Sequence, residues 1–172
     1  MTVKTGSLFD SIEQLGSGSG YVAEIADMLE SADMFRDLNR HDVERFANYF
    51  QAYAAPKGVI VLEEGRRESY MFVIATGKLD IFKNSAGRDE KKIATVRAGK
   101  TIGEMSILDG MNHSASAVVV EPATLLLLTK NKFEQFMQAE PEVALKVLRK
   151  MAQLMSLRLR QTSGILIDHL PK

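Results

Sequence analysis

The spacing of apolar residues changes twice along the chain. From about residue 8 to residue 50, apolar side chains recur every three or four positions, the period of an amphipathic helix. From about Gln51 to Lys130 apolar and polar positions alternate, as in half-buried strands, and after Lys130 the helical spacing returns. The pattern predicts a mainly β fold with flanking helices: a β-roll or jelly roll, preceded by short helices and followed by a long C-terminal helix.

Short helices are expected before the β region. The first has Ser7 as N-cap candidate and apolar positions at Leu8, Ile12 and Leu15; the glycine and serine run at residues 16–20 then predicts a flexible linker. A second helix follows the linker, and a third begins near the N-cap candidate Asn39. Their apolar faces consist of Val22, Ile25, Ala26 and Leu29, and of Val43, Phe46, Ala47 and Phe50.

Glycines punctuate the alternating region. Strands are expected at residues 59–65, 69–77, 78–84, 91–99, 114–120 and 123–129. Glycine adopts positive φ without strain, so it suits the corners of a roll, and here it stands at Gly58, Gly65, Gly77, Gly87 and Gly99.

The last region predicts a short helix and a long one. Phe133, Phe136 and Met137 mark the first, and the second runs from Pro141 to about residue 163. Apolar residues cover much of the circumference of the long helix, which indicates two packing partners. One face would pack on the roll and the other, formed by Leu148, Met151 and Met155, on a second copy of the chain. Alternatively, the tail "GILIDHLPK" covers the second face.

Composition limits the classes of protein that remain. The chain has 172 residues, no cysteine, and 22 basic against 22 acidic residues, so disulfides and a net charge that favours nucleic acid or membranes are excluded. No stretch approaches the roughly 18 unbroken apolar residues of a membrane span. The N-terminus lacks a secretory pattern, and a cytoplasmic location is therefore expected.

Enzyme chemistry finds little support. His41, His113 and His169 lie far apart in sequence, and no nucleophile-elbow, zinc-protease or P-loop motif is present. We therefore expect no catalysis, no metal and no cofactor. The stretch "GEMSILDGMNHSASAVVV" at residues 103–120 is different, because a helical turn that begins near Glu104 exposes backbone N–H groups to which an anion can bind.

The order of these segments resembles the cyclic nucleotide-binding domain family, in particular the sensor part of the cyclic AMP receptor proteins. The similar stretches are "MFRDLNRHDVERFA", "KGVIVLEEG", "YMFVIATGKLDIF" and the phosphate-binding cassette "AGKTIGEMSILDG", and the resemblance covers about residues 32–163. It implies a cyclic nucleotide-binding-like domain at residues 32–172, with residues 1–31 as an N-terminal helical extension.

The resemblance also implies roles for individual residues. The turn Gly103, Glu104, Met105 and Ser106 would hold the ligand, with the Glu104 carboxylate on the ribose hydroxyls. Ser114 and the amide of Ala115 would donate to phosphate oxygens. The purine would lie against Ile81 and Ile93, which could equally be core residues of the roll.

One position departs from the family pattern. His113 stands where members that bind cyclic nucleotides usually carry an arginine, whose guanidinium grips the phosphate with two hydrogen bonds. A partly cationic histidine would weaken binding roughly ten- to a hundred-fold. The alternative is that His113 is a solvated turn residue beside a vestigial pocket. Lys100 or Arg97 turned into the pocket would favour a ligand.

Two further expectations concern the C-terminus. Thr162 and Ser163 resemble a hydroxyl pair that reaches the base in the receptor proteins, or else simply end the helix before Gly164. About nine residues follow Ser163, too few for a DNA-reading domain. The sequence thus favours a ligand-sensing homodimer that acts on an unknown protein partner, without direct DNA or membrane binding. The alternative is a scaffold domain, or a sensor of a cyclic dinucleotide.

Overall fold

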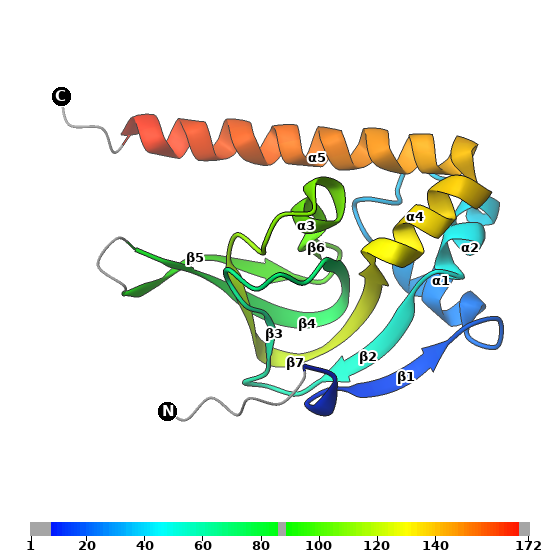
Figure 1. Ribbon diagram of the computed structural model, residues 1–172, viewed down its shortest axis with the longest axis horizontal. Coiled ribbons are helices and arrows are strands. Elements are labelled where there is room, and N and C mark those ends of the chain that lie inside the picture. Colours follow the sequence, from blue (N-terminus) through cyan, green and yellow to red (C-terminus); the bar gives the residue numbers. More distant parts are fainter. Residues whose placement is uncertain (1–7, 86–88, 169–172) are drawn as a thin grey trace.

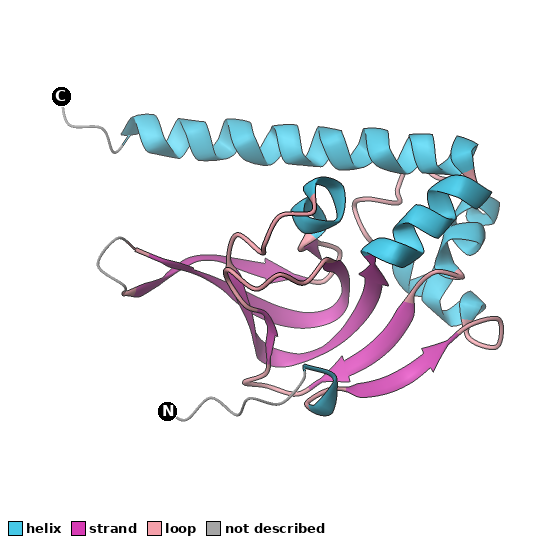
Figure 2. Cartoon of the chain, viewed as in Figure 1, coloured by secondary structure: helices cyan, strands magenta, loops and turns pink. Residues whose placement is uncertain are grey.

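A bent antiparallel sheet forms the centre of the protein, and helices cover one end and one side of it (Figures 1 and 2). The computed structural model describes residues 8–85 and 89–168. In chain order the elements are the 3-10 turn η1 (Leu8–Asp10), β1 (Glu13–Ser17), α1 (Val22–Glu30), α2 (Arg40–Ala47), β2 (Gln51–Ala55), β3 (Ile60–Leu62), β4 (Tyr70–Asn84), β5 (Glu90–Arg97), β6 (Thr101–Ile102), α3 (Glu104–Asp109), β7 (Ser116–Thr129), α4 (Lys130–Ala139) and α5 (Pro141–Asp168). The predicted β-roll with flanking helices is confirmed.

The strands of the described chain pair in the order β1-β2-β7-β4-β5, with β3 on β7 and β6 on β4. The strands predicted at 69–77 and 78–84 form one continuous strand, β4, and those predicted at 114–120 and 123–129 form β7. Each observed strand continues through an expected corner. Gly77 lies at the bend of β4 with φ +89°, and a Cβ atom there would lie 2.5 Å from the carbonyl oxygen of Pro122. Glycine is therefore required where β4 and β7 approach each other. Gly58, Gly65 and Gly99 also have positive φ as expected, whereas Gly87 lies outside the described residues.

The predicted helix over residues 8–15 is wrong. After the short turn η1, the chain enters β1, which pairs with β2 and buries Ile12 beside it. Pairing with β2 satisfies the backbone groups of this segment better than a short isolated helix could. Gly16 belongs to β1, and a Cβ atom there would lie 2.3 Å from the ring of Tyr21, so this run is a tight connection to α1 rather than a linker. Ser7 lies outside the described residues.

Two apolar clusters hold the fold together. One fills the helical end, where the predicted faces of α1 and α2 meet α4 and α5, and Phe46 stacks on Phe136 with ring centroids 4.0 Å apart. Asn39 caps α2 as expected, since its side-chain oxygen accepts from the backbone N–H of Asp42 at 2.8 Å. The other cluster fills the roll. Since α1 shares the first core and β1 shares the sheet, residues before Ala32 pack with the rest; the expected division at residue 32 stays a prediction.

The long helix α5 differs from expectation in two respects. It continues through Gly164 to Asp168, so Thr162 and Ser163 do not end it and residues 164–168 do not fold back. Met151 is only 1% exposed and packs in the helical core, so its predicted place on a face toward a second copy is wrong. None of the described helices combines the length and apolar character needed to cross a membrane.

Candidate functional site

A cavity of about 690 Å³ lies between the roll and α5. Figure 1 shows α3 beneath the middle of α5, on the side of the sheet that α5 covers. β5, α3, the loop after α3 and the start of β7 line this cavity together with one side of α5. The structure brings into it all nine residues predicted as ligand contacts: Ile81, Ile93, Gly103, Glu104, Met105, Ser106, His113, Ser114 and Ala115.

The turn that begins α3 is built by its own residues. Gly103 is the N-cap with φ +81°, and a Cβ atom at this position would lie 2.7 Å from the carbonyl oxygen of Tyr70. Ser106 is buried, and its hydroxyl donates to the carbonyl oxygens of Gly103 at 2.9 Å and Tyr70 at 3.3 Å. Gly110, with φ +70°, ends the helix. α3 is thus locked against β4 while Met105 remains exposed.

An ion pair joins α3 to α5. Glu104 is 5% exposed, and its Oε1 atom accepts a hydrogen bond from Nη1 of Arg158. The second guanidinium nitrogen of Arg158 donates to the carbonyl oxygen of Thr101 at 3.1 Å and to its hydroxyl at 3.3 Å. Oε2 of Glu104 is buried and has no hydrogen-bond partner within residues 8–85 and 89–168. The carboxylate predicted to bind the ribose is therefore held by an arginine from 54 residues farther along the chain.

Arg158 is the main site residue that the sequence analysis missed. A signal was present, because Arg158 precedes Thr162 by four residues, which places both on one face of a helix. Thr162 does line the cavity, and its hydroxyl donates to the carbonyl oxygen of Arg158 at 2.9 Å. Ser163, the other member of the predicted hydroxyl pair, is not among the lining residues. Of the two, Thr162 alone lies at the cavity.

His113 lines the cavity, and it is not the solvated turn residue of the alternative expectation. Its side chain is 3% exposed, not solvated, and its ring meets the ring of Tyr70 edge-on with centroids 5.1 Å apart. Its backbone is fixed to the turn before β4: Gly65 N–H donates to its carbonyl at 2.9 Å, and its own N–H donates to the carbonyl of Arg66 at 3.2 Å. Burial lowers the pKa of His113, although the carboxylate of Glu68 acts in the opposite sense. The imidazole is thus held neutral near pH 7, and its Nε2 atom is buried without a partner.

The other cavity residues differ in exposure. Ile93 is 57% exposed, so it is not a core residue, whereas Ile81 is half-buried and packs partly on the roll cluster. Arg97 and Lys100 both line the cavity, as the ligand hypothesis required. Lys100 is bound to Asp33 at 2.5 Å, and this contact lowers the pKa of the Asp33 carboxyl. The ammonium group of Lys100 is therefore already paired with the Asp33 carboxylate.

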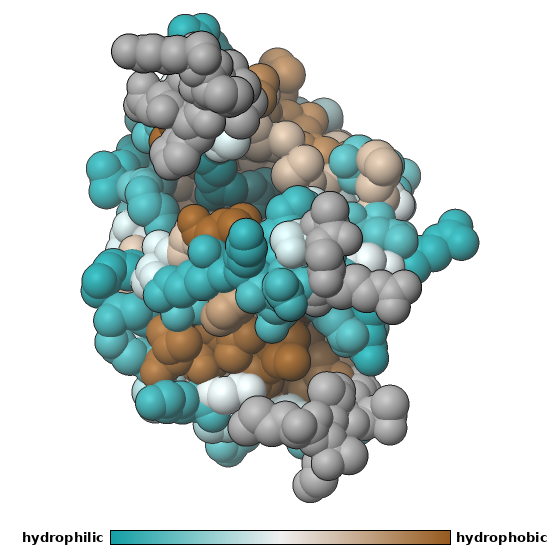
Figure 3. Space-filling view, turned by 90° about the vertical axis from the view of Figure 1, so that its left-hand side faces the viewer, coloured by the Kyte–Doolittle hydropathy of each residue, from teal (hydrophilic) through white to brown (hydrophobic). Residues whose placement is uncertain are grey.

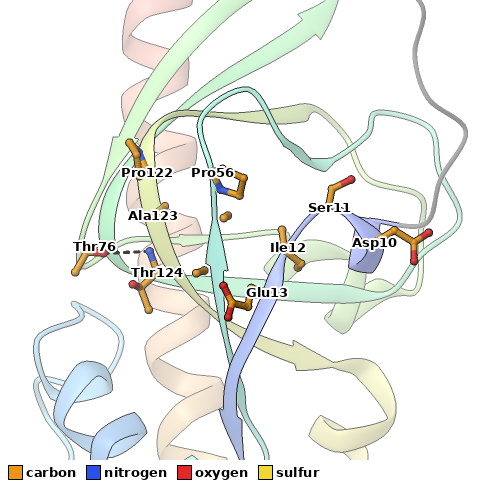
Figure 4. A pocket seen from close by; sticks show the side chains of 11 residues that line it. Asp10, Ser11, Ile12, Glu13, Pro56, Thr76, Pro122, Ala123 and Thr124 are labelled. Carbon is orange, nitrogen blue, oxygen red and sulfur yellow. Dashed lines mark hydrogen bonds between the residues drawn. The ribbon is translucent and has the colours of Figure 1, made fainter.

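A second cavity lies at the other side of the roll, between the N-terminal segment and the bend of β4 and β7 (Figure 4). Ile12, Pro56, Pro122 and Ala123 contribute its apolar lining, and Thr124 N–H donates to the hydroxyl of Thr76 at its edge. It contains no predicted site residue. Within the described residues, no cluster of three or more His, Asp or Glu side chains is placed to hold a metal ion.

A β-roll whose cavity is bounded by a short helical turn and closed by a C-terminal helix defines a class of small-molecule-binding domains. Residues 54–140 match the family described as cyclic nucleotide-binding domain. Because that match spans half of the chain, the protein belongs to the cyclic nucleotide-binding domain family. The resemblance expected from the cassette and the glycine pattern is thereby confirmed.

Several relatives give the family match more detail. The cyclic AMP receptor protein of Thermus thermophilus is 31% identical over 133 residues, which is 77% of this chain and 60% of that protein. A cAMP-dependent protein kinase regulatory subunit from Blastocladiella emersonii is 25% identical over 104 residues, 60% of this chain and 26% of the subunit. The chain thus spans less than two thirds of these relatives. The crystal structure of a cyclic nucleotide-binding domain from Methylobacillus flagellatus is 31% identical with a TM-score of 0.84, covering 98% of this chain and 95% of that one.

Proposed function

We propose that this protein is a regulatory, non-catalytic domain that binds cyclic AMP or cyclic GMP in the cavity beneath α5 and transmits occupancy through that helix. The observation that carries the proposal is the convergence of all nine predicted contacts on one cavity. Membership of the cyclic nucleotide-binding domain family adds to it. A volume of about 690 Å³ falls within the range typical of small-molecule sites.

The residues divide the work of binding. The apolar side chain of Ile93, exposed at the mouth, offers a surface for the purine, and Glu104 offers a carboxylate to the ribose hydroxyls. The amides of Ser114 and Ala115 are the proposed phosphate donors. Arg158 occupies only Oε1 of Glu104, so a ribose hydroxyl can bond to Oε2 of the same carboxylate, and one side chain then joins the ligand to α5. Occupancy can shift α5 only by the difference in ligand affinity between its positions.

The proposal extends to partners and location. Leu145 and Leu159 are exposed on α5, at 69% and 68%, and offer an apolar surface for a second copy or for a downstream protein. The proposed function includes no cofactor and no direct binding of DNA or membrane. The proposed location is the cytoplasm.

Isothermal titration calorimetry with cyclic AMP and cyclic GMP tests binding, and 5′-AMP serves as the non-cyclic control. We expect saturable binding of one or both cyclic nucleotides that is at least tenfold tighter than binding of 5′-AMP. Amide hydrogen exchange, measured with and without ligand, should change in α5 around residues 154–162 if occupancy is transmitted. Absence of binding by both cyclic nucleotides, in protein shown to be folded, would overturn the proposal.

A second candidate function follows from the state of His113. Because the imidazole is buried and neutral, the loop after α3 does not supply the cation that a buried phosphate requires. The alternative is a domain that does not bind cyclic mononucleotides and acts as a protein-interaction scaffold, or that senses a cyclic dinucleotide. Titration with cyclic di-AMP and cyclic di-GMP separates these two possibilities.

A further inference from the structure

A pair of lysines lies next to the mouth of the cavity, where β4 and β5 approach their hairpin. Ile81 of β4 lines the cavity, and Lys83 lies two residues farther along the same strand, so both side chains project from the same face of the sheet. Lys91 of β5 is the cross-strand partner of Lys83. Figure 3 shows a band of hydrophilic side chains crossing this end of the molecule at the level of the hairpin.

Lysines directly opposite each other in a sheet repel and destabilise the pairing. The cost falls when an anion lies between them, or when a partner neutralises one of them. Lys83 has only a weak anionic contact, since its Nζ atom lies 3.5 Å from Oε1 of Glu64. The same Nζ atom donates to the carbonyl oxygen of Ser114 at 2.6 Å, so its charge already sits at the predicted phosphate-binding loop.

The other cations around the cavity are less suitable. Arg158 is committed to Glu104 and Thr101, and Lys100 is bound to Asp33. Arg97 lines the cavity, but it is the cross-strand partner of Lys78, five residues along β4 from Lys83, and so lies away from Ser114. The side chain of Lys83 is 50% exposed and flexible. Its ammonium group can therefore give up its hydrogen bond to the Ser114 carbonyl oxygen and donate to a phosphate oxygen instead.

We propose that Lys83 supplies the positive charge for the cyclic phosphate of the ligand, at the end of the cavity where His113 is buried, and that Lys91 adds to the potential there. The inference rests on the proposed binding of a cyclic nucleotide in this cavity. A lysine ammonium is a point charge without the two-pronged geometry of arginine, and here it is open to solvent. The site therefore binds its anion by a contact that depends on salt.

The test compares two lysine variants by calorimetric titration with cyclic AMP and cyclic GMP. Lys83→Gln removes the proposed contact. Lys92→Gln is the matched control, because Lys92 also has a side-chain exposure of 50% and one ion pair, with Asp80, but is the cross-strand partner of Phe82 on the opposite face. We expect Lys83→Gln to weaken binding about tenfold and Lys92→Gln to leave it within about twofold.

Salt dependence separates a charge contact from a merely structural role. Between about 50 and 200 mM salt the affinity of the unmodified protein should fall, and Lys83→Gln should reduce that fall while Lys83→Arg keeps it. Equal affinities of Lys83→Gln and Lys92→Gln, with the unmodified protein binding, would overturn the inference and leave the proposed function standing. No binding by the unmodified protein would overturn both.

Discussion

The two ends of the cavity are built in opposite ways. At the α3 end, the buried carboxylate of Glu104 is paired with Arg158, which also bonds to Thr101. At the other end, Nε2 of the buried His113 ring has no hydrogen-bond partner among the described residues, and burial lowers the pKa of the ring against the opposing effect of Glu68. The α3 end thus contains an ion pair with Arg158 of α5. The His113 end contains the loop after α3, to which Lys83 donates a hydrogen bond.

The two ends of the cavity should therefore respond differently to mutation. Breaking the charged end leaves a buried carboxylate without its counterion, which is costly for folding as well as for binding. At the neutral end, the His113 ring is buried against Tyr70 and carries no paired charge, so removing its side chain leaves no buried ion behind. In the proposed function, the α3 end would couple the ligand to α5 and the His113 end would set how strongly an anion binds.

The largest expected effect comes from removing the arginine of the charged end. Arg158→Met leaves Glu104 buried and unpaired, and we expect the free energy of unfolding to fall by about 2 kcal/mol, discounted because Arg158 is 44% exposed. Arg160→Met, on the exposed surface of α5, is the control and should change it by less than about 0.5 kcal/mol. Urea denaturation measures both. Equal effects would show that the ion pair contributes nothing to the fold.

The neutral end can be given a permanent charge. His113→Arg should strengthen binding of cyclic AMP about tenfold, because a guanidinium can form two hydrogen bonds with a phosphate. Calorimetric titration measures the change, and His113→Gln, which adds no charge, is the control. If the arginine and glutamine variants bind equally, the side chain at position 113 does not contact the phosphate.

A smaller effect is expected when the carboxylate, rather than the arginine, of the ion pair is neutralised. Glu104→Gln leaves Arg158 able to turn toward water, so we expect a loss of about 1 kcal/mol in unfolding free energy, less than for Arg158→Met. The double variant should be no less stable than Arg158→Met alone, since its only unpaired buried charge has been removed. Additive losses in this cycle would contradict direct coupling.

The smallest effect is a pH dependence that arises at the neutral end. Burial depresses the pKa of His113 below its ordinary 6.5, so below about pH 6.5 the unfolded chain binds more protons than the folded one. Stability from the neutral imidazole is complete above that pH and is lost as the pH falls, by no more than about 1.4 kcal/mol per pH unit. Denaturation of the protein and of His113→Gln at pH 7.5 and 5.5 measures this. A difference between them that does not change with pH would refute the assignment.

The sequence predicted most of the elements but not their extent. Helical spacing with an Asn39 cap located α2, and glycines with positive φ marked the corners of the roll. It failed at residues 8–15, where pairing with β2 overrides a weak helical pattern, and at Gly164, where α5 continues through a residue that usually ends helices. Met151 was assigned to the wrong face because apolar residues surround the helix, and periodicity alone does not choose among them.

By itself, the sequence determined the class of fold through short-range spacing, and its resemblance to the family pointed to nine of the residues that line the cavity. Only the tertiary structure decided the charge of the site. Whether His113 is cationic depends on its burial against Tyr70, and whether Glu104 is free depends on Arg158, which α5 brings from 54 residues away. Burial and long-range pairing determine electrostatics, and neither can be read from the order of residues along the chain.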